Sequence, residues 1–273
     1  MKNFHQLTIE SESLDGQDIV FDLDGTLIEG DIGETLFYHS LLAVSMYARS
    51  DEKWSQPFSG LDPKEPIPVR GESAQLLFDY QTALAEGAFE KAYTRTAIWL
   101  ESFPREEIEL LLLRLLAAAT QPVRMPCRVY VNGISRDMQI SYGVRVKADM
   151  RALVRIFREQ GARLWIVSAS PQVVCELVGR EFQIPPHNIL GVQASADGQQ
   201  VSRFPWGAGK VRVLHEAGVT QPLFAFGDGE GDIEMLSLAR YPVVIANGSA
   251  SLLHIARQKD WWVYYVWNGP INI

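Results

Sequence analysis

Three short, largely apolar runs that end in polar, reactive side chains constrain this sequence more than any other feature. Residues 18–23 lead into Asp24, residues 163–168 end at Ser168, and residues 223–227 lead into Asp228. None of the runs has helical periodicity, and each is followed within a few residues by glycine or proline. We therefore expect three buried β-strands whose carboxyl ends carry chemically active residues.

The arrangement of strands and helices around these runs predicts the fold class. Further strands are expected at residues 241–246 and 262–266, and helical patterns occur at 171–178, 211–216 and 233–239. Continuously apolar strands that alternate with helices indicate a parallel sheet covered on both faces. The prediction is an α/β protein with a Rossmann-like, doubly wound core. Residues 188–204 indicate a strand and a hairpin, with its turn at Asp197-Gly198.

The segment after the first strand has a different, mostly helical pattern. An amphipathic stretch at 34–48 precedes a proline-rich loop at 56–71 and helical patterns at 72–86, 88–101 and 105–120. We therefore predict an inserted all-helical cap domain, residues 30–143. The core would consist of residues 1–29 and 144–273.

Composition and charge exclude several classes of protein. With 47% apolar and 21% charged residues, the chain is of the globular type. Its formal charge of −8 argues against nucleic acid as a partner. Residues 108–119 are too short to span a membrane and contain Arg114, so we expect no membrane partner. Cys127 and Cys175 follow no disulfide or zinc pattern, and no secretory signal is evident, so we expect a cytoplasmic location.

The residues at the strand ends predict a site for a metal and a phosphate group. In an open parallel sheet, ligands bind beyond the carboxyl ends of the strands. Four carboxylates would gather there, from Asp22, Asp24, Asp228 and Asp232. Because these charges repel one another, they indicate a hard divalent cation such as Mg²⁺. Lys210 would add a positive charge that offsets a nucleophilic carboxylate and a phosphoryl group together.

Four motifs, in order, resemble those of the haloacid dehalogenase superfamily. They are Val20-Phe-Asp-Leu-Asp-Gly-Thr-Leu27, Ser168, Lys210, and Gly227-Asp-Gly-Glu-Gly-Asp232. An insertion between the first two motifs is similar to the helical cap of the phosphoserine phosphatase-like branch. Two positions depart from that branch: Gly231 stands where it usually has asparagine, and Ala169-Ser170 stands where it usually has two glycines.

The resemblance implies a role for each matching residue. Asp22 would be the nucleophile that forms an aspartyl-phosphate. Asp24 would protonate the leaving alcohol and then deprotonate the attacking water. Ser168 and the amide of Ala169 would bind phosphate oxygens, while Lys210 would stabilise the charge.

The resemblance also implies which residues would hold Mg²⁺. Asp22, Asp228 and the backbone carbonyl of Asp24 would be ligands, and Asp232 would be a further ligand or would support one. The residues alone leave a second interpretation of the serine motif open, because Ser168 or Ser170 could simply cap the following helix.

These inferences predict a Mg²⁺-dependent phosphatase that hydrolyses a small phosphorylated metabolite through an aspartyl-phosphate at Asp22. A phosphotransferase or mutase would share the first half of that reaction. A protein phosphatase and a non-catalytic binding protein also stay open as interpretations of the sequence. The intact pair of Asp22 and Asp24 argues against a purely binding role.

Acidic residues after the first motif suggest a positively charged substrate. Asp31 lies nine residues after Asp22, where the phosphoserine phosphatase-like branch places an acid that holds a substrate amine. One interpretation is a substrate with an amine or quaternary ammonium group near its phosphate, with Phe37, Tyr38 or Trp54 as an aromatic wall. The second interpretation is that Asp31 is a solvated charge at a helix start, where the helix dipole favours it.

Overall fold

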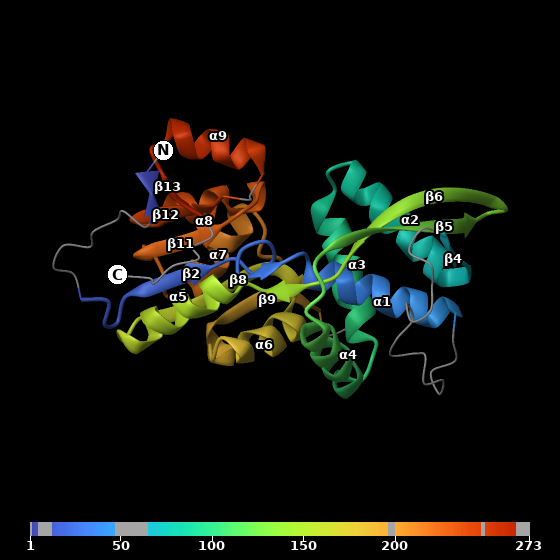
Figure 1. Ribbon diagram of the computed structural model, residues 1–273, viewed down its shortest axis with the longest axis horizontal. Helices are drawn as coiled ribbons and strands as arrows, with labels where there is room; N and C mark the ends of the chain where they lie inside the picture. The colour runs from blue at the N-terminus through green and yellow to red at the C-terminus, as the bar shows by residue number, and fades with distance from the viewer. Residues whose placement is uncertain (1, 5–12, 47–64, 196–199, 247–248, 266–273) are drawn as a thin grey trace. The chain divides into compact units, whose positions relative to one another are not determined.

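The computed structural model describes residues 2–4, 13–46, 65–195, 200–246 and 249–265, and these form two compact units (Figure 1). The core unit comprises the described residues of Met1–Glu29, Val146–Gln193 and Ser202–Ile273. The inserted unit comprises those of Gly30–Arg145 and Ala194–Val201. Among the described residues, no helix is both long and apolar enough to cross a membrane.

The core unit is built on an eight-stranded sheet with the order β1-β13-β12-β11-β2-β8-β9-β10. The strands, in that order, are Lys2–Asn3, Trp262–Tyr264, Tyr241–Ile245, Phe224–Gly227, Asp18–Phe21, Arg163–Pro171, Ile189–Ala194 and Val201–Arg203. From β1 to β9, every neighbouring pair is parallel. The predicted parallel sheet is thus confirmed, and β2 lies between β11 and β8, where the order of the strands reverses along the chain.

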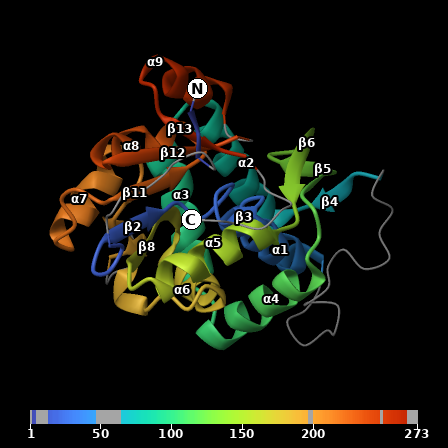
Figure 2. The same ribbon diagram turned by 60° about the vertical axis from the view of Figure 1, so that its left-hand side comes forward.

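Helices cover both faces of this sheet, as expected for a doubly wound fold (Figure 2). The core helices are α5 (Ala148–Glu159), α6 (Gln172–Glu181), α7 (Ala208–Glu216), α8 (Ile233–Leu238) and α9 (Ala250–Gln258), with short 3-10 turns at Pro186–Asn188 and Glu230–Asp232. On one face, the Phe157 ring of α5 lies 6.3 Å from that of Phe21. On the other, Val20 packs in one cluster with residues of α7, α8 and α9.

The inserted unit contains helices and also a sheet, so the prediction of an all-helical cap is wrong. Its helices are α1 (Ile32–Met46), α2 (Gly71–Ala85), α3 (Phe89–Glu101) and α4 (Arg105–Ala118). Its strands β4 (Ile67–Val69), β5 (Val123–Val131) and β6 (Ile134–Tyr142) form a three-stranded sheet. Asn132 and Gly133 join β5 to β6 with φ angles of 52° and 77°, the positive values that a tight hairpin turn requires.

The chain leaves the core unit after Glu29, and the second boundary lies close to but not at the predicted position after residue 143. The second boundary lies at Arg145, and β3 (Ile28–Glu29) and β7 (Arg145–Val146) are the short strands where the chain passes between units. The described residues at 194–195 and 200–201 group with the inserted unit, where the backbone N–H of Ala194 donates to Glu101 Oε1 at 3.5 Å. The predicted turn at Asp197-Gly198 lies outside the described residues.

Candidate active site

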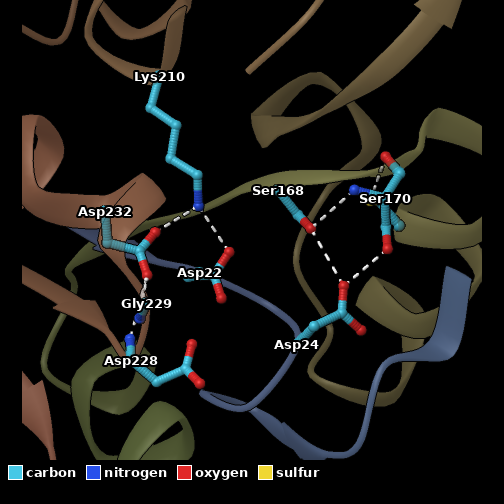
Figure 3. A network of polar contacts seen from close by, with 9 residues as sticks. Asp22, Asp24, Ser168, Ser170, Lys210, Asp228, Gly229 and Asp232 are labelled. Carbon is cyan, nitrogen blue, oxygen red and sulfur yellow. Dashed lines mark hydrogen bonds and ion pairs between the residues drawn. The ribbon is translucent and has the colours of Figure 1, made fainter. Parts of the chain in front are cut away.

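The predicted strand-end residues come together at the carboxyl ends of β11, β2 and β8 (Figure 3). Asp22 directly follows β2, and its N–H donates to the carbonyl of Phe226 in β11 at 2.9 Å, which continues the strand pairing by one residue. Because β2 is buried between its two neighbours, this backbone position is fixed. Asp22 as a whole residue is only 6% exposed.

Lys210, in the first turn of α7, joins two of the predicted carboxylates. Its Nζ lies 2.6 Å from Asp22 Oδ1 and 2.6 Å from Asp232 Oδ1, and all three side chains are buried. Burial alone would lower the pKa of Lys210, but attraction to Asp22 and Asp232 outweighs burial and raises it. Lys210 is therefore a permanent cation that holds one oxygen of Asp22 in place.

Asp232 also fixes the loop that follows β11. Its Oδ2 accepts the N–H groups of Asp228 at 3.1 Å and Gly229 at 3.0 Å, while its Oδ1 faces Lys210. A Cβ at Gly227 would lie 2.6 Å from that of Asp232, so only glycine allows the carboxylate to fold back over the loop. Both oxygens of Asp232 therefore have hydrogen-bond partners. Its main structural role is to hold Lys210 and the loop after β11 in place.

The cluster contains more negative charge than Lys210 neutralises. Single carboxylate oxygens of Asp22, Asp228 and Asp232 lie within 4.8 Å of one another. Burial and the charge of Asp232 raise the pKa of Asp22 well above its usual range, although Lys210 opposes this. Burial and Asp232 likewise raise the pKa of Asp228 to about 7. Such an excess of carboxylate oxygen suits a hard divalent cation.

The carboxylate of Asp228 lies against the turn that follows Asp24. A Cβ at Gly25 would lie 2.0 Å from Asp228 Oδ2, so the carboxylate of Asp228 rests against this turn, where Gly25 has a φ of +72°. No hydrogen bond to the Asp228 carboxylate occurs within the described residues. Asp22, Asp228 and Asp232 thus each offer a carboxylate oxygen to one cluster, and carboxylate oxygens are donors of the type that would suit Mg²⁺.

Replacing Asp228 should raise the stability of the metal-free protein and abolish its stabilisation by Mg²⁺. In metal-free protein, Asp228→Asn removes a charge that its neighbours disfavour, and we expect Tm to rise by about 2–4 °C, the shift that ~1 kcal/mol produces in a chain of this size. Stabilisation by added Mg²⁺ should disappear. Thermal unfolding in chelator and in excess Mg²⁺ measures both, with the exposed Glu230→Gln as control. A lower metal-free Tm, or a retained Mg²⁺ shift, contradicts this account.

Asp24 lies beside the serine motif at the end of β8. Ser170 Oγ donates to Asp24 Oδ2 at 2.6 Å, and Ser168 Oγ lies 3.4 Å from the same oxygen (Figure 3). The N–H of Ser170 donates to Ser168 Oγ at 3.1 Å, and the half-buried Ala169 lies between the two serines. The structure therefore brings Asp24 and Ser168 together, and it adds Ser170, which sequence reasoning interpreted only as a helix cap.

Lys147 is a second buried cation that sequence reasoning missed. It directly precedes α5, and its ammonium donates to the carbonyl of Gly25. Burial lowers its pKa, while Asp228 and Asp149 act in the opposite direction. No motif marks this residue, because its position depends on how the chain re-enters the core after the insertion. Lys147 therefore adds a positive charge near Asp228 that the sequence motif does not indicate.

The indole of Trp206 explains one departure from the expected pattern. A Cβ at Gly231 would lie 2.6 Å from Trp206 Nε1, and Gly207 N–H donates to the Gly231 carbonyl at 2.9 Å. An asparagine at this position would clash with the indole. Glycine is therefore required by the packing of this particular chain.

Asp31 lies in the inserted unit, at the start of α1. Its Oδ1 accepts the N–H of Glu34 at 2.7 Å, as expected for a residue that caps a helix. Phe37 and Tyr38 are 0% and 2% exposed within the apolar core of that unit, so they do not form the aromatic wall that the sequence suggested. Trp54 lies outside the described residues.

Comparison with known families identifies the chain. The sequence model of the haloacid dehalogenase-like hydrolases matches residues 19–237. The chain belongs to this family. The family model makes this haloacid dehalogenase-like protein a hydrolase, and the carboxylates Asp22 and Asp24 lie at its candidate site.

Individual relatives are distant and add evidence mainly about the fold. A Mycobacterium leprae protein named as a hydrolase is 26% identical over 127 residues, which cover 43% of this chain and 41% of that protein. A functionally unknown protein from Anaerococcus prevotii superposes with a TM-score of 0.59 at 18% identity, covering 94% of this chain and 87% of that one. One from Bordetella pertussis gives 0.57 at 18% identity, covering 92% and 100%. The chain thus spans about two-fifths of the named relative and nearly all of the two structures.

Proposed function

We propose that this hydrolase cleaves a small phosphorylated metabolite in a Mg²⁺-dependent reaction with an aspartyl-phosphate at Asp22. The observation that carries the proposal is the fixed geometry of two carboxyl groups with different partners. Lys210 holds Asp22 at 2.6 Å, while Ser170 holds Asp24 at 2.6 Å. Two such groups in unlike surroundings suit a nucleophile and a proton donor.

The reaction would proceed in two steps on these side chains. First, a carboxylate oxygen of Asp22 bonds to phosphorus while the ester P–O bond breaks, and Asp24 gives its proton to the departing alkoxide. Second, water bonds to phosphorus and passes a proton to Asp24, and the bond between phosphorus and Asp22 breaks. Inorganic phosphate leaves, and both carboxyl groups return to their starting state.

The remaining site residues would bind the metal ion and the phosphate group. Asp22, Asp228 and the Asp24 carbonyl would hold Mg²⁺, which supplies Lewis-acid stabilisation of phosphoryl charge when bound. Lys210 would balance the charge of Asp22 and of the phosphoryl group. The Ser168 hydroxyl and the Ala169 amide would donate to phosphate oxygens.

A direct assay tests the proposal. We expect phosphate release from several small phosphomonoesters with Mg²⁺, loss of that release after chelation, and recovery on adding Mg²⁺ back. Ca²⁺, which is larger and more highly coordinated, should inhibit. Full activity after exhaustive chelation would refute the metal requirement. Phosphate appearing on an added alcohol instead of in solution would favour a phosphotransferase, and release only from phosphoproteins would favour a protein phosphatase.

The preferred substrate would carry a positive charge if Asp31 binds it. The proposal predicts higher kcat/KM for phosphoserine, phosphoethanolamine and phosphocholine than for glycerol phosphate and sugar phosphates, with a selective loss for the cationic esters in Asp31→Asn. Asn retains an oxygen that can accept the Glu34 N–H, so the cap is preserved. An equal change for all esters would assign Asp31 to helix capping alone.

A further inference from the structure

The serine motif leaves the regular strand just before it reaches Asp24. In the register of β8 with β9, Val167 pairs with Leu190 and Pro171 pairs with Val192. Three residues, 168–170, therefore face one residue, Gly191. Such a bulge turns side chains away from the ladder and is common beside active sites. Here it turns both serine hydroxyls towards Asp24 (Figure 3).

The backbone of Ser170 is fixed on both sides. Its N–H donates to Ser168 Oγ at 3.1 Å, and its carbonyl accepts from the buried Cys175 Sγ of α6 at 3.4 Å. A Cβ at Gly191 would lie 2.9 Å from that carbonyl, so β9 also packs closely against it. Ser170 itself is 5% exposed. These backbone contacts and the burial of Ser170 therefore fix the direction of its hydroxyl group.

The two serines differ in what their hydroxyl groups can do. Ser170 Oγ donates its only proton to Asp24 Oδ2 over 2.6 Å, a short bond typical of a hydroxyl and a carboxylate. Ser168 Oγ is 3.4 Å from that oxygen, which is at the limit of a hydrogen bond, and it already accepts the Ser170 N–H. Ser168 can thus turn its proton to a phosphate oxygen while Ser170 remains bound to Asp24.

We propose that Ser170 is a positioning residue that sets the orientation of the Asp24 carboxyl group. By donating to Oδ2, it fixes the plane in which the carboxyl group lies when that group exchanges a proton with the leaving group and with water. A glycine, which the phosphoserine phosphatase-like branch usually has here, carries no hydroxyl for this purpose. The inference rests on the proposed function, and it concerns a residue that this function does not itself require.

Leaving-group dependence distinguishes a positioning role from phosphate binding. In Ser170→Ala, we expect kcat for alkyl phosphates to fall about 10- to 100-fold, part of the 10²–10⁴ that proton transfer contributes. For 4-nitrophenyl phosphate, whose leaving group needs no proton, the loss should be under about threefold, and KM should change little. Ser170→Thr, which keeps the hydroxyl, should recover most of the rate. Ser237→Ala, on the exposed side of α8, is the matched control.

A double-variant cycle then tests whether Ser170 acts through Asp24. In an Asp24→Asn background, Ser170→Ala should cause no further loss, because the group that it positions is already disabled. Additive losses, an equal loss for all leaving groups, or a higher KM with unchanged kcat would each overturn the proposal. The last of these would make Ser170 a phosphate ligand.

A structural measurement keeps the inference testable apart from the reaction. In crystals of metal-free Ser170→Ala, the Asp24 carboxyl group should rotate or adopt two conformers, whereas wild type should show one. An unchanged single conformer in the variant would overturn the proposal. If wild type released no phosphate from any ester, the proposed function would fail, and the crystal structures would still report on the link between Ser170 and Asp24.

Discussion

Asp22→Asn should lower kcat by about four orders of magnitude or more, as loss of a covalent nucleophile does in other hydrolases. Asparagine has nearly the same shape, but its amide cannot form a stable bond to phosphorus and then release it to water. The variant should also fail to accumulate a phosphorylated form when mixed with substrate and quenched in acid. Retention of even a tenth of the wild-type kcat would place the nucleophile elsewhere.

The same substitution should leave the fold intact, and this separates chemistry from stability. Burial and neighbouring carboxylates raise the pKa of Asp22, so its charge is not a net source of stability in the metal-free protein. Lys210 keeps its second partner, Asp232, at 2.6 Å. We therefore expect an unchanged or slightly higher Tm for Asp22→Asn without metal. Asp15→Asn, at an exposed position in the same unit, should alter neither quantity.

The core could be predicted from sequence because its strands are short, continuously apolar and end in recognisable motifs. β2, β8 and β11 each coincide with a predicted run, and their parallel pairing explains why Asp22, Asp228 and Ser168 lie at the same edge of the sheet. The pairing follows from the doubly wound pattern, in which strand ends share one edge. Local sequence and global fold agree at these positions.

The inserted sheet was missed although the sequence signals it. Asn132-Gly133 is a strong hairpin turn, and Met125, Cys127 and Val129 alternate with more exposed residues along β5. The partner strand β6 is largely exposed, with Ile140 as its buried residue, so it lacks the apolar pattern that marks a core strand. An antiparallel strand at the edge of a sheet can leave most of its side chains in solvent, because hydrogen bonds to the neighbouring strand hold its backbone in place.

The positions of Ser170 and Lys147 depend on contacts far away in the sequence. Ser170 faces Asp24 because β8 bulges against β9, a register that no local pattern encodes. Lys147 reaches the carbonyl of Gly25 across 122 positions of chain. Motifs therefore identified the chemical groups of the site, while their orientation required the tertiary structure.

Lys210→Met should produce the second large effect, on stability and turnover together. The variant leaves Asp22 and Asp232 buried beside each other without their cation, and breaking a buried ion pair in this way typically costs ~3–5 kcal/mol. We also expect kcat/KM to fall by about 10³-fold, the order that an electrostatic stabiliser contributes to transition states. Urea unfolding in chelator and steady-state kinetics in Mg²⁺ measure the two effects.

The stability loss in Lys210→Met should depend on pH with a defined sign. A carboxyl group whose pKa is raised by folding favours the folded state at low pH, and that contribution is lost as pH rises through the raised pKa. The pKa of Asp22 is already raised by burial and Asp232, and removing Lys210 takes away the charge that opposes this. The difference from wild type should therefore be smallest at low pH, where Asp22 is protonated, and should grow as pH rises through the raised pKa of Asp22. Adding Asp232→Asn should restore much of the stability at high pH, because it removes the carboxylate that repels Asp22. It should not restore the turnover, because the cation is still missing. A stability gap independent of pH would mean that Lys210 contributes packing and not charge.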